Sequence, residues 1–187
     1  MARWLPSLLV LAACKEQPSK LDRVKPSPDE IGIAGGAIVL DGELAEAGWN
    51  ARAQRGVFLG ADGTLARPYS EIRLLADAAT LYVGLYAADE DLEPSDAFEL
   101  QLGALAVTVH ADGKVVPQLP SAIDRDGTLG QPKDDDEEWV VELAVPRAQL
   151  GPDPNAPLAV SARRCDTPKD GVARCGQWAR TLALPRR

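Results

Sequence analysis

The sequence predicts an all-β protein, an antiparallel two-sheet β-sandwich, with a β-barrel as the alternative. Three observations predict it. Short apolar runs recur along the chain, separated by clusters of turn-forming residues. Within these runs, apolar side chains alternate with polar or small ones, which is the period of a half-buried strand. Glycine (16 residues) and proline (15 residues) are frequent, whereas helical periodicity is confined to two short stretches.

The expected elements follow from these runs in chain order. Leu81, Val83 and Leu85 share one face of their strand, and Tyr82 and Tyr86 share the other. The same alternation defines the remaining strands with less regularity. The expected strands cover residues 37–40, 71–77, 80–87, 96–102, 106–111, 138–146, 158–164 and 177–184, and the short helical segments cover 43–53 and 146–150.

The first 13 residues are typical of an export signal. Arg3 gives the start of the chain a positive charge, and residues 5–13 are apolar except for Ser7, a run shorter than the roughly 20 residues that span a bilayer. The Leu-Ala-Ala-Cys ending at Cys14 resembles the bacterial lipobox, which implies cleavage before Cys14 and its lipidation. An ordinary cleaved signal, or a misplaced start codon with an incidental cysteine, is the alternative. Lys15, in place of Asp, resembles lipoproteins sorted to the outer membrane.

A polar segment separates Cys14 from the expected sandwich. Residues 14–36 contain Pro18, Pro26 and Pro28 and show no apolar periodicity, so we expect a flexible tether there. The folded domain is expected at residues 37–187, with the membrane contacted through the lipid alone.

Two further cysteines, Cys165 and Cys175, predict a disulfide bond. Export places both in an oxidising compartment, and residues 166–174 between them are rich in turn formers. A metal-binding or redox pair is the alternative, but the C-x-x-C spacing and a nearby histidine are both missing from the sequence.

Charge and motifs exclude several classes of function. The chain has 28 acidic and 20 basic residues and a net charge of −8, so it lacks the positive footprint that nucleic acid requires. The G-x-S-x-G, P-loop and H-E-x-x-H motifs are absent from the sequence. No pair of carboxyl groups is singled out for glycoside hydrolysis. We therefore expect a protein that is not an enzyme.

A series of segments in a fixed order is similar to the family 9 carbohydrate-binding modules and their DOMON-like relatives. The segments are residues 38–42 (Ile-Val-Leu-Asp-Gly), 46–49 (Glu-Ala-Gly-Trp), 71–77 leading into 81–85, 96–100 (Asp-Ala-Phe-Glu-Leu) and 139–146. The resemblance covers residues 37–184. It implies a sandwich of jelly-roll or immunoglobulin-like type, a noncatalytic role, sugar binding between aromatic rings and, in some members, structural calcium.

The candidate ligand residues follow from the scarcity of aromatic side chains. Trp49 and Trp139 are expected in the core, which leaves Trp178 as the candidate sugar platform, with Tyr86 and Arg73 as its companions. An outer sheet face without a ligand is the alternative for Tyr86. Haem binding, known among DOMON relatives, is excluded because the processed chain retains a single histidine, His110, and no methionine.

An acidic stretch follows the strand at 80–87. Asp89, Asp91 and Asp96 supply the hard oxygen ligands that calcium prefers, so we expect either a calcium site or a hydrated acidic loop. Beyond that possible calcium ion, no cofactor is expected. The run at residues 134–138 is expected to serve solubility.

Together these features predict an envelope lipoprotein whose sandwich binds polysaccharide or cell-surface glycan. The alternative is a structural or interaction lipoprotein that docks another envelope protein without binding sugar.

Overall fold

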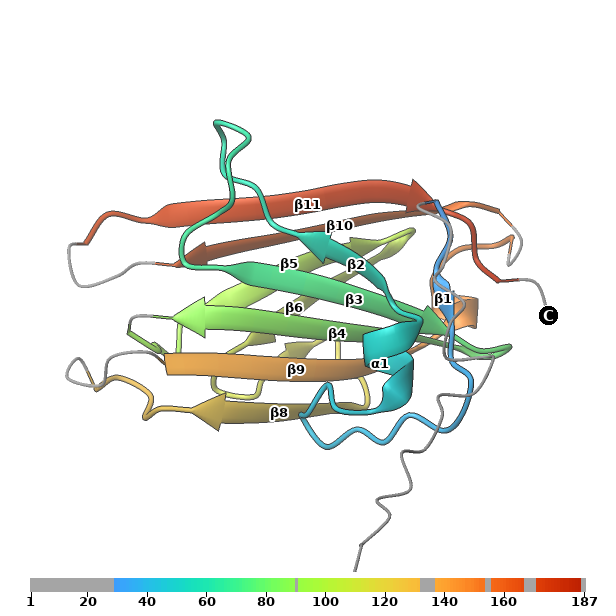
Figure 1. The fold of residues 1–187 in the computed structure, drawn as a ribbon, viewed down its shortest axis with the longest axis horizontal. Coiled ribbons are helices and arrows are strands. Elements are labelled where there is room, and N and C mark those ends of the chain that lie inside the picture. The colour runs from blue at the N-terminus through green and yellow to red at the C-terminus, as the bar shows by residue number, and fades with distance from the viewer. Residues whose placement is uncertain (1–28, 90, 132–136, 154–155, 167–170, 186–187) are drawn as a thin grey trace, which may run out of the picture.

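The computed structural model describes residues 29–89, 91–131, 137–153, 156–166 and 171–185. Eleven strands and one short α-helix make up this part of the chain (Figure 1). The elements are β1 (Gly32–Ile33), α1 (Ala47–Ala51), β2 (Gln54–Val57), β3 (Ser70–Ala76), β4 (Thr80–Asp89), β5 (Ala97–Leu102), β6 (Leu105–His110), β7 (Val115–Val116), β8 (Ser121–Asp126), β9 (Glu137–Pro146), β10 (Leu158–Asp166) and β11 (Arg174–Leu182). A 3₁₀ turn, η2 (Arg147–Gln149), occupies the second predicted helical segment.

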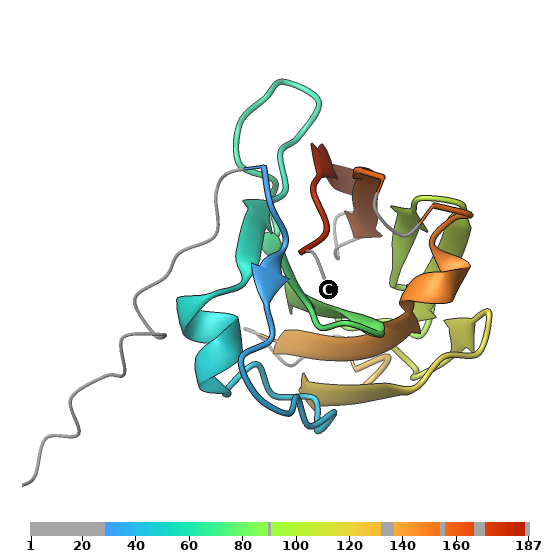
Figure 2. The ribbon, with the colours of Figure 1, turned by 90° about the vertical axis from the view of Figure 1, so that its right-hand side faces the viewer.

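These strands form two sheets that face each other, which Figure 2 shows with the strands nearly end on. One sheet has the order β1-β3-β4-β9-β8, with β2 also paired to β3, and the other has the order β11-β10-β5-β6-β7. Of the described strand pairs, β1–β3 is parallel and the others are antiparallel. The predicted β-sandwich is therefore confirmed.

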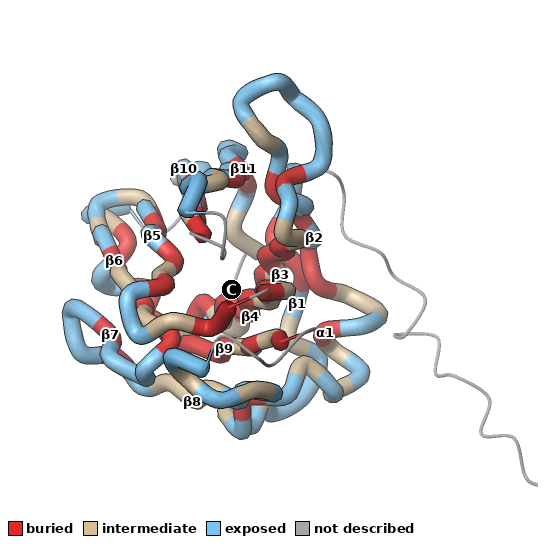
Figure 3. The backbone as a smooth tube through the Cα atoms, turned by 90° about the vertical axis from the view of Figure 1, so that its left-hand side faces the viewer, coloured by how far each residue is buried: buried red, intermediate tan, exposed pale blue. Residues whose placement is uncertain are grey.

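The core lies between the inner faces of the sheets, as the buried segments in Figure 3 indicate. Leu85 of β4 lies opposite Val141 of β9, and both are fully buried. Across the sandwich, the ring of Phe98 contacts that of Trp139 with centroids 4.8 Å apart. Each such large side chain contributes roughly 1.5–3 kcal/mol of burial free energy. The alternation predicted from the sequence thus marks the core-facing side of both strands, and the core position predicted for Trp139 is confirmed.

Helix α1 covers part of the outer face of the six-stranded sheet. Trp49 is fully buried there, as predicted, and its Nε1 donates a hydrogen bond to Glu142 Oε1 at 2.8 Å. Burial raises the pKa of Glu142, and hydrogen bonds from the backbone amides of Asp41 and Gly42 and from Trp49 oppose this shift. Gly84 lies beneath, where a Cβ atom would approach Leu44 Cδ2 to 2.5 Å. The absence of a side chain at Gly84 thus makes room for Leu44 and Trp49.

Two sequence-based boundaries are wrong. Residues 37–40 form no strand; Ile38 packs instead against Trp49, Ala53 and Leu75. Ile38 thus covers the outside of the sheet, whereas Val39 is 59% exposed. The folded domain also begins before residue 37, because Ile31 is buried in the core and its amide donates to Ala183 O at 2.9 Å.

Strands β1, β2, β7 and β8 escaped prediction, because β1 and β7 have two residues each and β2 and β8 lack a long apolar alternation. Strand β8 is an edge strand whose last three residues are exposed, and β2 contains Arg55 and Gly56. Cys14 and residues 14–28 of the predicted tether lie outside the described residues. In the part of the chain that the structure describes, no helix is both long enough and apolar enough to cross a membrane.

Candidate functional site

Trp178 lies where the two sheets meet along one edge. The loop between β2 and β3 projects beyond β11 (Figure 1), and Leu59 at its start exchanges two backbone hydrogen bonds with Gln177, at 2.9 and 3.0 Å. The indole of Trp178 packs on Gly56, where a Cβ atom would lie 2.1 Å from Nε1. Trp178 is 9% exposed. It belongs to the core and also reaches the surface.

A groove of about 630 Å³ opens along this edge, and we call it the seam groove. Its floor and walls come from β2, from the loop that follows and from β11. The lining residues are Arg55, Gly56, Val57, Leu59, Gly60, Ala61, Gly63, Gln177, Trp178, Ala179 and Arg180. The described lining therefore contains two arginines and no carboxylate. The volume lies within the roughly 300–1,000 Å³ typical of small-molecule sites.

Arg73 and Tyr86 come together on the outer face of the six-stranded sheet, around Glu71. Glu71 lies directly opposite Tyr86 in the β3–β4 register, and its Oε1 accepts from Arg73 Nε at 2.6 Å. The hydroxyl of Tyr69 donates to the other oxygen of Glu71 at 2.8 Å, and the rings of Tyr69 and Tyr86 are 6.0 Å apart. We call Tyr69, Glu71, Arg73, Tyr86 and Glu138 the tyrosine face.

Both tyrosines of this face are held in their neutral form. Partial burial raises the pKa of Tyr69 to about 12, and its hydrogen bond to the Glu71 carboxylate adds to the shift. Burial likewise raises the pKa of Tyr86 to about 12, helped by its hydrogen bond to Glu138 Oε2 at 2.5 Å. The hydroxyl groups therefore remain hydrogen-bond donors at physiological pH, with their direction set by the carboxylates.

Arg55 connects the tyrosine face with the seam groove. It lines the groove, and its Nε lies 3.8 Å from Glu71 Oε1. Trp178 itself lies on the other sheet, so the three predicted ligand residues form two neighbouring sites. Sequence reasoning missed Arg55, Glu71 and Arg180. The alternation of Glu71 and Arg73 with buried neighbours on β3 is a signal that could have placed those two on the outer face.

The disulfide Cys165–Cys175 is confirmed. The two cysteines are directly opposite each other in the β10–β11 ladder, with Cα atoms 4.0 Å apart. The bond therefore pins the end of β10 to the start of β11.

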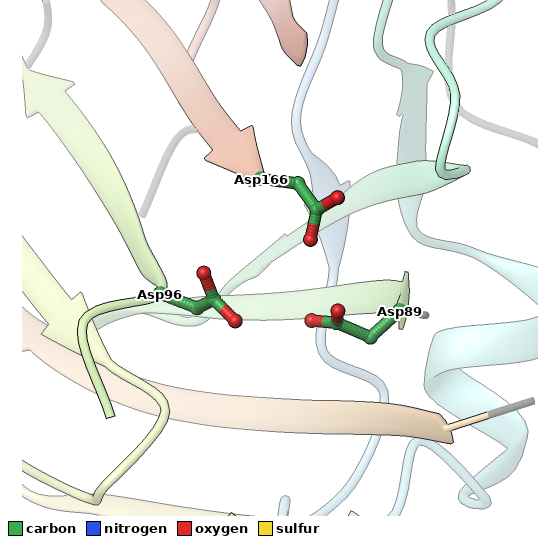
Figure 4. Close-up of side chains that lie close together, drawn as sticks. All are labelled: Asp89, Asp96 and Asp166. Atoms are coloured by element: carbon green, nitrogen blue, oxygen red, sulfur yellow. The ribbon is translucent and has the colours of Figure 1, made fainter. Parts of the chain in front are cut away.

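A buried acidic cluster occupies the same end of the sandwich (Figure 4). Asp89 at the end of β4, Asp96 just before β5 and Asp166 at the end of β10 turn their carboxyl groups toward one another, with one oxygen of each within 4.8 Å of the others. All three are at most 4% exposed. Arg164 Nη2 donates to Asp89 Oδ2 at 2.6 Å and to Asp166 Oδ1 at 3.0 Å. We call these four residues the acidic cluster.

One guanidinium faces three carboxyl groups in this cluster. Burial raises the pKa of Asp96 to about 6 and the pKa of Asp166 to about 7, and neighbouring carboxylates add to both shifts. Asp166 Oδ2 is buried and has no hydrogen-bond partner among the described residues. Buried carboxyl oxygens in excess of the available donors are suited to a hard cation such as calcium, so the residues fit this ion.

The predicted calcium set is only partly assembled. Asp89 and Asp96 belong to the acidic cluster, whereas Asp91 does not; the Asp91 amide donates to Asp89 Oδ1 at 3.2 Å. The third carboxyl group comes from Asp166, which is distant in sequence. No local spacing could have revealed it, because β10 reaches this point through the sheet topology.

Comparisons with known proteins support the fold. No protein-family model matches the chain, and no curated protein matches it. The chain is similar to a family 9 carbohydrate-binding module from Caldicellulosiruptor kristjanssonii solved in complex with cellotriose, with a TM-score of 0.56, 16% identity and coverage of 84% of this chain and 94% of that one. The complex of a family 9 module from the same organism with glucose gives a TM-score of 0.56, 14% identity and coverage of 84% and 96%. The protein therefore has the β-sandwich fold of the family 9 carbohydrate-binding modules, as its sequence predicts.

Proposed function

We propose that the protein is a noncatalytic carbohydrate-binding domain and that the seam groove holds the sugar. The observation that carries this proposal is Trp178, which is 9% exposed and lines an open groove of about 630 Å³. A pyranose ring offers C–H groups to an aromatic side chain and hydroxyls to fixed polar groups. Arg55, Gln177 and Arg180 supply such groups around the indole. The solved modules of the same fold, bound to cellotriose and glucose, support the assignment of the ligand class.

The proposal of a noncatalytic role rests on the groove lining. Glycoside hydrolysis requires two carboxyl groups about 5–9.5 Å apart that face one cleft. The described lining of the seam groove contains neither Asp nor Glu. A bound sugar in this groove would therefore meet hydrogen-bond donors and an aromatic ring but no acid–base pair.

A glycan-array and calorimetric screen of the purified chain tests this function. We expect saturable binding of at least one sugar class, reduced about tenfold or more by Gln177→Ala and by Trp178→Ala. Arg163→Gln, an exposed change on the neighbouring β10, is the control and should leave binding unchanged. Thermal unfolding of each variant separates lost binding from lost folding. Absence of binding across the screen by the folded wild type would overturn the proposal.

We further propose that the domain is an envelope lipoprotein anchored through Cys14. The support is the apolar run before Cys14 and the polar segment after it. Incorporation of a radiolabelled fatty acid, lost in Cys14→Ser, tests the anchor. Fractionation of inner and outer membranes tests the outer-membrane location proposed from Lys15. Incorporation that persists in Cys14→Ser would contradict the assignment.

A second candidate function is docking of another envelope protein. The observation that favours it is the group of exposed apolar side chains beside the groove: Val57, Leu59 and Leu65 are 39–50% exposed. In this case crosslinking from residue 65 in intact cells would trap one envelope protein, and the screen above would give no sugar binding.

We also propose that the acidic cluster binds calcium. Asp89, Asp96 and Asp166 would hold the ion, which would supply positive charge to carboxyl groups that one guanidinium leaves in excess. Calcium that binds only the folded state raises its stability. We therefore expect the Tm to be higher in calcium than in EDTA, with magnesium as the control. Equal Tm values in calcium and EDTA would contradict this site.

A further inference from the structure

The seam groove carries positive charge on a protein whose net charge is −8. Arg55 and Arg180 contribute to its described lining, and no carboxylate does. Arg180 is exposed on β11, and 43% of the Arg55 side chain is exposed. This acidic chain thus places two arginines around Trp178, the tryptophan that reaches the surface among those the structure describes.

The nearest carboxylate cannot neutralise Arg55. Glu71 lies 3.8 Å from Arg55 Nε but makes a shorter contact, 2.6 Å, with Arg73 Nε. Its other oxygen accepts from the hydroxyl of Tyr69. Two guanidinium groups thus share one carboxylate, which leaves one positive charge in excess on the side of the groove. The remaining hydrogen bonds of Arg55, to the neutral oxygens of Asn50 and Trp49 at 3.3 and 3.5 Å, do not alter this charge.

The adjoining hollow differs in charge. A depression of about 400 Å³ on the outer face of the five-stranded sheet also reaches Gln177 and Trp178. There Arg163 forms an ion pair with Glu99 at 3.0 Å, so its charge is balanced. The seam groove therefore differs in charge from this hollow, whose lining includes both Arg163 and Glu99.

We propose that the seam groove selects sugars that carry a carboxylate, the uronic acids, over neutral sugars. This inference rests on the proposed carbohydrate-binding function and names its ligand class. A uronate places a planar carboxylate on a pyranose ring, and the guanidinium group of arginine matches a carboxylate with two parallel N–H donors. In this arrangement the pyranose ring contacts Trp178, and the guanidinium groups of Arg55 and Arg180 bind the carboxylate of the uronate.

The test compares three matched oligosaccharides by titration calorimetry with the full chain. The probes are trigalacturonate, its fully methyl-esterified form, which keeps the ring but loses the charge, and neutral cellotriose. We expect trigalacturonate to bind about tenfold or more tightly than its ester, since one charge-assisted contact corresponds to about that factor. Arg180→Gln and Arg55→Gln should each reduce this ratio. Arg163→Gln is the control, because its charge is balanced by Glu99, and should preserve it.

The outcomes separate this inference from the proposed function. Equal affinity for the acid and its ester, with binding that Gln177→Ala weakens, would overturn the preference for uronate and leave carbohydrate binding in place. A preference that survives both arginine substitutions in folded variants would also overturn it. Failure of every probe in this series and in the wider glycan screen would overturn the function itself.

Discussion

The two ion clusters of this sandwich differ in burial and in the balance of their charges. In the acidic cluster, Arg164 and its carboxylate partners Asp89 and Asp166 have side chains at most 2% exposed. On the tyrosine face, the side chains of Glu71 and Arg73 are 11% and 17% exposed, and Arg55 beside them is 43% exposed. The first cluster has three carboxyl groups and one guanidinium group, whereas on the tyrosine face Arg55 and Arg73 share the Glu71 carboxylate.

This difference indicates separate roles. Charges withdrawn from water carry a large desolvation cost, so they must satisfy one another or bind an ion, and their removal affects folding. Charges near water are stabilised by solvent, contribute little to folding and are available to a ligand. We therefore assign the acidic cluster to stability and the arginines around Glu71 to recognition. The predictions below test this division, beginning with the largest expected effect.

Arg164→Met should destabilise the protein by about 3–5 kcal/mol, because it leaves buried carboxyl groups without their guanidinium partner. Arg73→Met, the matched change on the tyrosine face, should cost about 1–2 kcal/mol, because Glu71 keeps its hydrogen bond from Tyr69 and Arg55 stays nearby. Urea denaturation of both variants at pH 8 in EDTA measures the two free energies of unfolding. Similar losses in the two variants would remove the distinction between the clusters.

Asp166→Asn should stabilise the acidic cluster, because it removes one of three carboxyl groups that face a single guanidinium group. The pKa of Asp166 is raised to about 7 by burial, so at pH 8 the wild-type group is charged in a site that favours its neutral form. In EDTA at pH 8 we expect a gain on the order of 1 kcal/mol, about 2–4 °C in Tm. The rise in Tm on addition of calcium should disappear. Asp126→Asn, an exposed change on β8, is the control; a calcium effect that persists in Asp166→Asn would contradict the proposed ligand.

The same contrast explains which features can be predicted from the sequence. Alternation along one strand is local, so Leu81, Val83 and Leu85 reveal the face of β4 that is buried. The acidic cluster is not local: Asp166 meets Asp89 and Asp96 only through the sheet order. Similarly, an apolar run does not distinguish a strand paired in a sheet from a segment that covers the outer face of the sheet. This is why the strand predicted at residues 37–40 is wrong.

The candidate binding site was also predictable only where the sequence signal is local. Trp178 was identified by elimination among few aromatic residues, and Arg73 and Tyr86 by the strands that carry them. Arg55 and Arg180 surround the same groove only because the loop after β2 pairs with β11. A single backbone bridge between two sheets leaves no pattern in the sequence.

Glu71→Gln should produce a small change in stability, about 1 kcal/mol, since its partners remain near water. Its larger consequence is local: the positive charge of Arg55 and Arg73 is then unopposed at the groove. We expect uronate binding to strengthen in this variant while the free energy of unfolding changes little. A loss in stability comparable with that of Arg164→Met would place Glu71 among the structural charges.

The smallest effect is spectroscopic and concerns the tyrosines. Spectrophotometric titration of the phenol groups should show Tyr69 and Tyr86 ionising near pH 12, because partial burial and hydrogen bonds to Glu71 and Glu138 favour the neutral form. In Glu71→Gln the pKa of Tyr69 should fall, since its charged acceptor is gone, while the pKa of Tyr86 should remain close to its wild-type value because Glu138 is retained. Assignment of the two transitions with Tyr69→Phe and Tyr86→Phe makes the comparison specific. Ionisation of both groups at the ordinary value near 10 would show that the carboxylates do not hold these hydroxyls in their neutral form.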